Sequence, residues 1–328
     1  MFTPTCVPGK VLRAQAKVLR DGSKAMPTSS TDETYTTAFE WPLQAMLFVP
    51  GDSQRKLDKA TTAGADAVIV DLEDSVAPSE KAQARHLARS YMGLSRRCKI
   101  GVRINSRETP WHLEDMAAIV SGKPDFLMLP KCASVDDLRI VHHQICVLEA
   151  SFGIEPGFVK LVPLVTETAA SVLGLDYRGA PSRLVAICFA GEDLSSDLGV
   201  ASRGAGRQFN PLLSIGRQLT ALAAAAAGVQ AIDTPFPDPR DHAGLKEEAI
   251  SAAQLGYAGK LCIHPCQVEV VKEAFRPNDE DLAWASSVVA AFRASSATGV
   301  AVLDGKMIDK AHLRLAMRRL AEKERLTQ

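Results

Sequence analysis

Acidic side chains follow several short apolar runs of this sequence, where they would gather if those runs are strands. Glu167 stands two residues after the run VKLVPLV, and Asp193 stands two residues after the run LVAICFAG. Carboxylates that converge on one concave site repel each other, and a hard divalent cation relieves that repulsion. Mg²⁺ suits such a site because it needs only one or two protein carboxylates, and Mn²⁺ can take its place. We therefore predict a metal site that stabilises an oxyanion, with helix capping or salt bridging as the alternative role of either residue.

Polar residues follow the other apolar runs too, so that almost every run ends beside a group able to act. They include Asp52 and Ser53, Asp71, Glu73 and Asp74, Arg103 and Asn105, Lys131, Glu192, Asp233 and His264. Helix capping is the competing explanation for Ser53 and Asp74, as it is for Asp241. A Schiff base at Lys131 is disfavoured because a lysine among carboxylates keeps its proton, so we expect an electrostatic role. The role of His264 stays open between function and packing.

The sequence lacks the nucleotide-binding and nucleophile motifs of several large enzyme classes. It has no Gly-Lys followed by Ser or Thr, no GxSxG, and no three-glycine fingerprint after an apolar run. Its 38 basic residues balance its 38 acidic residues, which argues against nucleic acid or an anionic membrane surface as a partner. The longest apolar stretch, residues 219–229, is shorter than the roughly 20 residues that span a bilayer. We interpret the closest cysteine pair, Cys262 and Cys266, as buried inert thiols rather than zinc ligands.

Eight apolar runs must position these groups. They are residues 45–50, 67–72, 100–105, 125–131, 159–165, 184–191, 229–234 and 260–264. Their continuous apolar character predicts strands buried on both faces, and amphipathic helical stretches separate them. This alternation predicts an α/β fold, a (β/α)₈ TIM barrel, with a doubly wound open sheet as the alternative. The residues that follow the strands of such a barrel meet at one end, where the active site lies.

Segments of different composition flank the predicted barrel. Residues 1–42 are predicted to be a flexible extension and residues 43–278 the catalytic barrel. Residues 279–328 are predicted to form a C-terminal helical lid or oligomerisation segment, with a hairpin around Asp304-Gly305. The extension has no acidic residue before Asp21, so a mitochondrial transit peptide is the alternative to the cytoplasmic protein that we expect.

Several motifs within about residues 44–320 carry a family resemblance. They are MLFVPGDSQRKLDKA, VIVDLEDSVAPSEKAQAR, VRIN, FLMLPK, FAGEDLSSDLG, AIDTPFPD, GYAGKLCIHPCQV and GKMIDKAHL, with a Glu-Thr-Ala after the fifth run. In order and spacing, these motifs resemble the citrate lyase β-subunit-like family of the HpcH/HpaI aldolase/citrate lyase superfamily, which includes malyl-CoA, citramalyl-CoA and citryl-CoA lyases. The resemblance implies a Mg²⁺-dependent barrel, coenzyme A as part of the substrate, and a homotrimer or hexamer.

The resemblance also assigns roles to single residues. Glu167 of the Glu-Thr-Ala motif and Asp193 of the Gly-Glu-Asp-Leu motif are the implied ligands of Mg²⁺, with Glu167 also facing the substrate. Arg103 of the Val-Arg-Ile-Asn motif is the implied catalytic contact of the oxo-acid carboxylate. Asp309 of the Gly-Lys-Met-Ile-Asp motif is implied to act over the active site of a neighbouring subunit.

Two further segments receive roles from the same resemblance. The acidic run at residues 71–74 is implied to surround the water molecules of the metal. The Pro50-Gly51 turn, with Arg55 and Lys56 after it, is implied to approach coenzyme A.

The predicted activity is the cleavage of a 3-hydroxyacyl-CoA to acetyl-CoA and a 2-oxo acid. The acid that protonates the thioester enolate would be Asp309, and Arg103 would clamp the carboxylate in its planar fork. Three alternatives remain at this point. They are a malyl-CoA thioesterase on the same metal site, a citrate lyase β subunit that acts only with its partner subunits, and a Schiff-base aldolase on Lys131.

Overall fold

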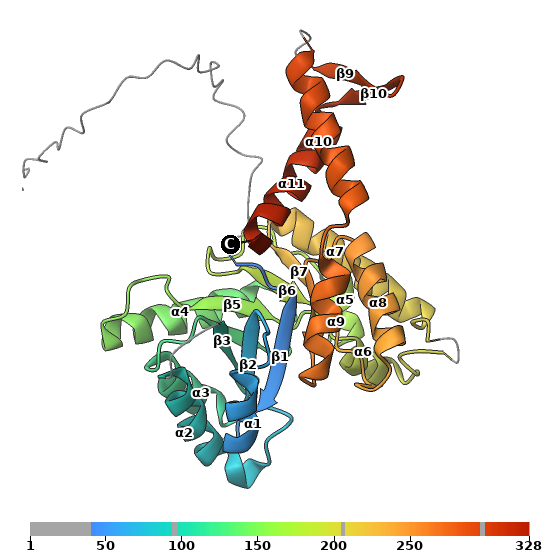
Figure 1. Cartoon of the computed structure of the whole chain (residues 1–328). Coiled ribbons are helices and arrows are strands. Elements are labelled where there is room, and N and C mark those ends of the chain that lie inside the picture. The colour runs from blue at the N-terminus through green and yellow to red at the C-terminus, as the bar shows by residue number, and fades with distance from the viewer. Residues whose placement is uncertain (1–40, 94–97, 205–206, 296–298, 328) are drawn as a thin grey trace, which may run out of the picture. The chain divides into compact units, whose positions relative to one another are not determined.

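The computed structural model describes residues 41–93, 98–204, 207–295 and 299–327 (Figure 1). The extension predicted over residues 1–42 lies outside the described residues except for its last two. In the part of the chain that the structure describes, no helix combines the length and the apolar character needed to cross a membrane.

Eight parallel strands form one sheet that curls into a nearly closed barrel (Figure 1). They are β1 (Ala45–Pro50), β2 (Ala67–Asp71), β3 (Lys99–Arg103), β4 (Phe126–Leu129), β5 (Lys160–Pro163), β6 (Ala186–Cys188), β7 (Gln230–Asp233) and β8 (Gly259–Cys262). Neighbouring strands pair in the order β5-β4-β3-β2-β1-β8-β7-β6. Parallel bridges from Leu161 to Leu184 and from Leu164 to Cys188 join the two ends of that order. The predicted TIM-barrel fold is thereby confirmed, rather than the open sheet.

Alternate side chains of each strand enter two different cores. Val68 and Val70 of β2 pack with the surrounding helices, whereas Ile69 between them packs inside the barrel with Phe126. This is why the strands need continuous apolar runs. The barrel interior also fixes a glycine, because a Cβ at Gly101 of β3 would lie 2.2 Å from ring atoms of Phe126.

Helices connect the strands and cover the outside of the barrel (Figure 1). They are α1 (Gln54–Ala60), α2 (Lys81–Met92), α3 (His112–Val120), α4 (Val135–Phe152), α5 (Ala169–Leu173), α6 (Gly191–Leu198), α7 (Pro211–Ala227), α8 (His242–Gln254) and α9 (Cys266–Phe275), with a 3₁₀ turn, η1 (Pro78–Glu80), before α2. Of the three predicted caps, Asp241 accepts a hydrogen bond from Gly244 N at 3.0 Å. Ser53 occupies the N-cap position of α1 but its side chain makes no capping hydrogen bond, and Asp74 instead lies 3.5 Å from Arg103.

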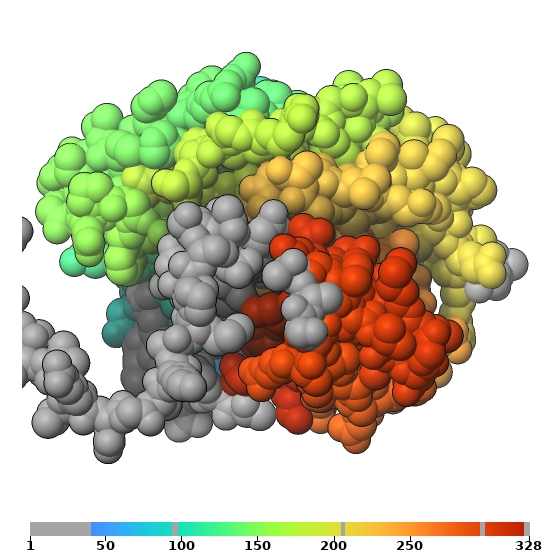
Figure 2. All heavy atoms as spheres, turned by 90° about the horizontal axis from the view of Figure 1, so that it is seen from above, coloured from blue at the N-terminus to red at the C-terminus, as the bar shows by residue number. Residues whose placement is uncertain are grey.

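The residues after α9 form an arm with a small core of its own. Helices α10 (Asp279–Ala294) and α11 (Lys310–Thr327) flank a hairpin of β9 (Val300–Leu303) and β10 (Lys306–Asp309). Asp304 and Gly305 have φ values of 50° and 75°, which the tight turn of such a hairpin requires. Figure 2 shows these segments, coloured orange to red, gathered into one block. Because α9 ends at Phe275 and α10 begins at Asp279, the arm starts beside the division predicted at residue 278, which itself stays a prediction.

Candidate active site

A cavity of 380 Å³ opens where β4, β5 and β6 end. Its walls come from the segments that follow β3, β4 and β5 and from helices α5 and α6. They consist of Glu108, Lys131, Cys132, Ala133, Glu167, Thr168, Ser171, Asp193, Ser196 and Asp197. The carboxyl ends of the strands therefore bring together the two residues that the sequence pattern singled out first.

Glu167 and Asp193 are held in this cavity in a state that favours a cation. Burial, together with the negative charge of Asp193, raises the pKa of Glu167 to about 8. Burial also raises the pKa of Asp193, and the charge of Asp74 adds to that effect. A raised pKa means that the ionised form is disfavoured where it stands. A divalent cation between the two carboxylates would reverse this by supplying positive charge.

The backbone after β4 positions Glu167. Lys131 has a φ of 52°, in the left-handed region that residues other than glycine rarely adopt. In that conformation its backbone N–H donates a very short hydrogen bond to Glu167 Oε2. Its side chain is half-exposed, with Nζ 3.8 Å from Glu73 Oε1, which agrees with an electrostatic role rather than the buried amine of a Schiff base. No motif or residue type predicted this backbone contact.

Two buried hydroxyl groups fix the start of α6, which carries Asp193 in its first turn. Thr166 Oγ1 accepts a hydrogen bond from Ala190 N at 2.8 Å, and Thr234 Oγ1 accepts one from Gly191 N at 3.0 Å. Because the threonines follow β5 and β7, the strands on both sides of β6 set the place of the helix.

Arg103 at the end of β3 is paired with an acidic residue of the neighbouring strand β2. Its Nε and Nη2 donate to the two carboxylate oxygens of Asp71, each at 2.7 Å. Burial alone would raise the pKa of Asp71, but the hydrogen bonds and charge of Arg103 hold it below its usual value. Asp71 thereby occupies one edge of the guanidinium, and Nη1 on its outer side donates to Asp74 Oδ2 in a long hydrogen bond of 3.5 Å.

Glu73 is a buried carboxylate of the site that lacks hydrogen-bond donors. Both of its carboxylate oxygens are buried without a hydrogen-bond partner. Nη1 of Arg103 lies 3.0 Å from Glu73 Oε2, an ion pair that lacks hydrogen-bond geometry. Burial raises the pKa of Glu73 to about 7 in spite of that neighbour. Buried acceptors of this kind are normally satisfied, and water molecules on a bound cation would satisfy them.

The side chains of the cavity fit Mg²⁺ better than a metal that needs three or more protein ligands. Among the described residues, no group of three or more His, Cys, Asp or Glu side chains converges to hold a metal. Two carboxylates, Glu167 and Asp193, with water and substrate oxygens as further ligands, match the way proteins bind Mg²⁺.

The residues expected to approach coenzyme A line another part of the same end of the barrel. Pro50 ends β1, and Gly51 N donates to Asp71 O at 2.9 Å. A Cβ at Gly51 would lie 2.8 Å from Asp71 O, so this turn can approach β2 so closely only with glycine. Arg55 and Lys56 are exposed in the first turn of α1, and neither lines the 380 Å³ cavity.

Asp309 ends β10 in the arm and is exposed. Its Oδ1 lies 2.7 Å from His312 Nδ1 and accepts from Ala311 N at 2.9 Å. The hydrogen bonds from His312 hold the pKa of Asp309 below its ordinary value. No described contact joins Asp309 to the cavity of its own chain, so its predicted role needs a second subunit.

Two expectations about other residues need correction. Asp233 does not join the acidic residues at the cavity, because it is fully buried and pairs with Lys260 and Arg217. Cys262 is buried as expected, but Cys266 is exposed, with Sγ 2.9 Å from His264 Nδ1. The first helical turn of α9 begins at Cys266, which turns its side chain outward.

Two acidic residues of the cavity wall were missed at the sequence level. Glu108 lies in the segment that follows β3, and Asp197 lies one helical turn after Asp193 in α6. The spacing of Asp193 and Asp197 was the available signal, because side chains four residues apart share one face of a helix.

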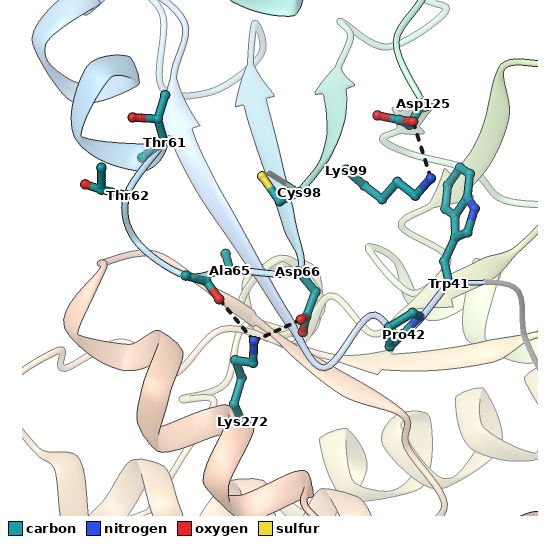
Figure 3. A pocket seen from close by; sticks show the side chains of 12 residues that line it. Trp41, Pro42, Thr61, Thr62, Ala65, Asp66, Cys98, Lys99, Asp125 and Lys272 are labelled. Carbon is teal, nitrogen blue, oxygen red and sulfur yellow. Dashed lines mark hydrogen bonds and ion pairs between the residues drawn. The ribbon is translucent and has the colours of Figure 1, made fainter. Parts of the chain in front are cut away.

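A larger hollow of 710 Å³ lies at the opposite end of the strands and has a different character (Figure 3). Lys272 Nζ lies 3.1 Å from Asp66 Oδ1. Lys99 Nζ lies 3.6 Å from Asp125 Oδ1 and 4.3 Å from the ring centroid of Trp41. Each lysine in this wall faces an aspartate, and a ligand would have to break such pairs.

Known proteins resemble this chain over most of its length. Residues 44–265 match the model of the family described as HpcH/HpaI aldolase/citrate lyase. The chain is 34% identical over 293 residues to a (3S)-malyl-CoA thioesterase of Cereibacter sphaeroides, which covers 86% of this chain and 95% of the relative. It is 31% identical over 324 residues to the mitochondrial citramalyl-CoA lyase of Homo sapiens, covering 93% of this chain and 91% of that relative. The crystal structure of the protein CitE from Mycobacterium tuberculosis, in complex with magnesium, acetoacetate and coenzyme A, has a TM-score of 0.70 at 33% identity, over 86% of this chain and 98% of that chain.

Proposed function

This chain belongs to the HpcH/HpaI aldolase/citrate lyase family, and from that premise we propose that it is a Mg²⁺-dependent carbon–carbon lyase. Its substrate would be a 3-hydroxyacyl-CoA of the citryl-CoA, citramalyl-CoA or malyl-CoA type, and its products acetyl-CoA and a 2-oxo acid. The observation that carries the proposal is the pair of carboxylates, Glu167 and Asp193, in one cavity at the ends of neighbouring strands.

Glu167 and Asp193 would hold the metal, and Glu73 would accept hydrogen bonds from its water ligands. The chemistry that bound Mg²⁺ supplies is the stabilisation of negative charge on the substrate oxygen that becomes the ketone. The Lys131 N–H keeps one oxygen of Glu167 in place. The threonine hydroxyls at the start of α6 do the same for the turn that carries Asp193.

Arg103 would bind the carboxylate of the oxo acid and orient the bond that breaks. Because Asp71 occupies its Nε edge, the guanidinium is already immobilised before substrate arrives. A preset cation loses less side-chain entropy on binding than a free one. Asp71 therefore orients Arg103.

The remaining steps need the proton donor and the coenzyme A contacts. When the carbon–carbon bond breaks, the 3-hydroxyl group of the substrate becomes the ketone and releases its proton to water, while the electron pair of the broken bond stays on the thioester side as an enolate, which takes up a proton. Asp309 of a neighbouring subunit in a homotrimer or hexamer would give that proton, and would act as the base in the synthetic direction. Pro50, Gly51, Arg55 and Lys56 would lie along coenzyme A.

A product assay tests the proposal. Purified full chain with Mg²⁺ and a panel of the three acyl-CoA types should yield acetyl-CoA and a 2-oxo acid in equal amounts from one of them. The panel is needed because these substrates differ by one methyl or carboxymethyl group, which the pocket shape must distinguish. Failure to form acetyl-CoA from any substrate would contradict the lyase.

Hydrolysis of the thioester is the second candidate, favoured by the malyl-CoA thioesterase among the relatives. The same assay separates it, because a thioesterase releases free coenzyme A and a hydroxy acid without acetyl-CoA. A citrate lyase β subunit is the third, and it would act only on an acyl-carrier thioester or together with partner subunits.

A further inference from the structure

Arg203, in the segment between α6 and α7, ties the first turn of α6 to the interior of the protein. Its Nη1 forms an ion pair with Glu192, the residue directly before Asp193. On its other edge, Nε and Nη2 donate to the two carboxylate oxygens of Glu248 in α8, at 2.8 and 2.9 Å. A single guanidinium thus spans from a half-exposed acid beside the site to a buried acid in a distant helix.

The inner end of this link is a buried network of ion pairs. Glu248 Oε1 also accepts from Lys260 Nζ at 2.8 Å, and Lys260 Nζ donates to Asp233 Oδ2 at 2.6 Å. Asp233 in turn receives the fork of Arg217 at 3.0 and 2.9 Å. Lys260 and Asp233 are completely buried, so removing any one charged side chain of the network would leave an unbalanced charge inside the protein. The network is therefore a fixed platform.

The plane of the Arg203 guanidinium is fixed as well. Its Cζ lies 4.5 Å from the ring centroid of Phe209 and 5.5 Å from that of Phe236. Nη2 also donates to Pro235 O at 3.2 Å. With one edge and the ring contacts set by the interior, the remaining nitrogen, Nη1, is directed at Glu192.

We propose that Arg203 is a positioning residue that sets the place of Asp193 through Glu192, an inference that rests on the metal site of the proposed function. The threonine hydroxyls hold the backbone at residues 190 and 191, just before this turn. The Arg203–Glu192 pair holds the turn from its outer side. Asp193 follows directly after these attachments, so a loss of the one at Glu192 would let the metal ligand shift.

Metal affinity tests this on the full chain, with Mn²⁺ as the probe and the electron paramagnetic resonance signal of free Mn²⁺ as the measurement. Arg203→Lys keeps the positive charge but cannot reach Glu192 and Glu248 together. We expect about tenfold weaker Mn²⁺ binding, because residues that orient metal ligands typically contribute 10–100-fold to affinity. If Arg203 acted only through its charge, the lysine variant would bind Mn²⁺ as the unaltered protein does, and that result would overturn the proposal.

Glu192→Gln gives an independent arm that leaves the buried Arg203–Glu248 pair intact. It should also weaken Mn²⁺ binding, and combining it with Arg203→Lys should add little, because both changes cut the same link. Additive losses in the double variant would show that the two residues act separately. Arg178→Lys is the matched control, since the Arg178–Asp176 pair is exposed, and it should leave Mn²⁺ binding unchanged.

A Glu167→Gln variant separates this proposal from the proposed function. If it loses Mn²⁺ binding while Arg203→Lys and Glu192→Gln bind normally, the metal site stands and the positioning role falls. If Glu167→Gln binds Mn²⁺ as well as the unaltered protein, the metal site itself is wrong and the positioning role falls with it.

Discussion

Carboxylates lie at both ends of the barrel, but their oxygens differ in whether they have hydrogen-bond or ion-pair partners. At the amino-terminal end, both oxygens of Asp66 are occupied, one by Lys272 at 3.1 Å and the other by Ala45 N at 2.9 Å. At the carboxyl-terminal end, both oxygens of Glu73 are buried without a hydrogen bond. Glu167 there has a pKa raised to about 8. The amino-terminal hollow is the larger of the two, so volume alone would have chosen the wrong end.

This difference teaches what marks a functional cluster of charges. A carboxylate with a structural role already has hydrogen-bond donors in the protein, as Asp66 has in Ala45 N at the start of β1. A carboxylate that serves a ligand is left short of donors, at a cost to stability that the ligand later offsets. Removing charges at each end should therefore have opposite consequences for activity and stability.

The largest effect is expected from the two proposed metal ligands. Glu167→Gln or Asp193→Asn should lower kcat/KM by about 10⁴-fold, because charge stabilisation by a metal contributes several kcal/mol and each 1.4 kcal/mol is tenfold. Thermal unfolding should not move to lower temperature, since the change removes like-charge repulsion. Steady-state assays and melting curves check both, and full activity of metal-free protein would contradict the metal site.

A somewhat smaller effect is expected from Asp309. Asp309→Asn should lower kcat by about 10³-fold with little change in KM, because only proton transfer is lost. Refolding Asp309→Asn together with Asp193→Asn should restore activity if the acid comes from the adjacent subunit, because some mixed oligomers then hold one intact site. Mixed oligomers without activity would place Asp309 in its own chain's site or outside the chemistry.

Arg103→Lys should reduce kcat/KM by about 10²-fold, since a point charge cannot reproduce the planar fork that Asp71 holds in place. Arg85→Lys is the matched control. Arg85 is another largely buried arginine, and its partners Glu114 and Asp115 do not line the cavity, so this variant should retain activity. Equal kinetics in the two lysine variants would remove Arg103 from the site.

The free energy of unfolding should depend on pH with a defined sign. The folded pKa values of Glu167 and Glu73, about 8 and about 7, lie above those of an unfolded chain. Between about pH 5 and pH 8 the folded metal-free protein therefore binds more protons than the unfolded one, and its free energy of unfolding falls as pH rises, by at most about 1.4 kcal/mol per pH unit for each proton. Urea unfolding across this range measures the slope. Glu167→Gln should make this dependence on pH weaker. A free energy of unfolding that rises with pH across this range would contradict the raised pKa values of Glu167 and Glu73.

The smallest effect is expected at the amino-terminal end. Lys272→Met removes the pair with Asp66, which is partly exposed, and should cost about 0.5–1 kcal/mol of the free energy of unfolding without changing kcat/KM. A loss of activity without a loss of stability would mean that this end of the barrel also takes part in function.

Much of the scaffold follows from local patterns. The run at residues 45–50 becomes β1 with those bounds, because a strand buried on both faces needs a continuous apolar run and leaves a plain signal. The apolar run at residues 184–191 is longer than the strand that it predicts. β6 spans only Ala186–Cys188, and Gly191, the last residue of the run, already begins α6. A helix start inside an apolar run leaves no change in hydropathy to read.

The contacts that complete the site lie beyond such patterns. The Asp71–Arg103 pair depends on the register between β2 and β3, which aligns these two residues as partners. The hydrogen bond from Lys131 depends on a left-handed backbone that its residue type does not announce. Arg203 acts across three segments that are distant in sequence. Residue type predicted which groups could act, whereas their pairing needed coordinates.

The junction between β5 and β6 has a consequence for hydrogen exchange. Isolated bridges join these strands, whereas the other neighbouring pairs share a ladder. Glu167 follows one of the two strands and Asp193 follows the other. A cation held by both would act as a crosslink across the least paired seam of the barrel. Amide protons of β5 and β6 would then exchange more slowly with the metal bound. The ion needed for chemistry would thus also stabilise the closed barrel.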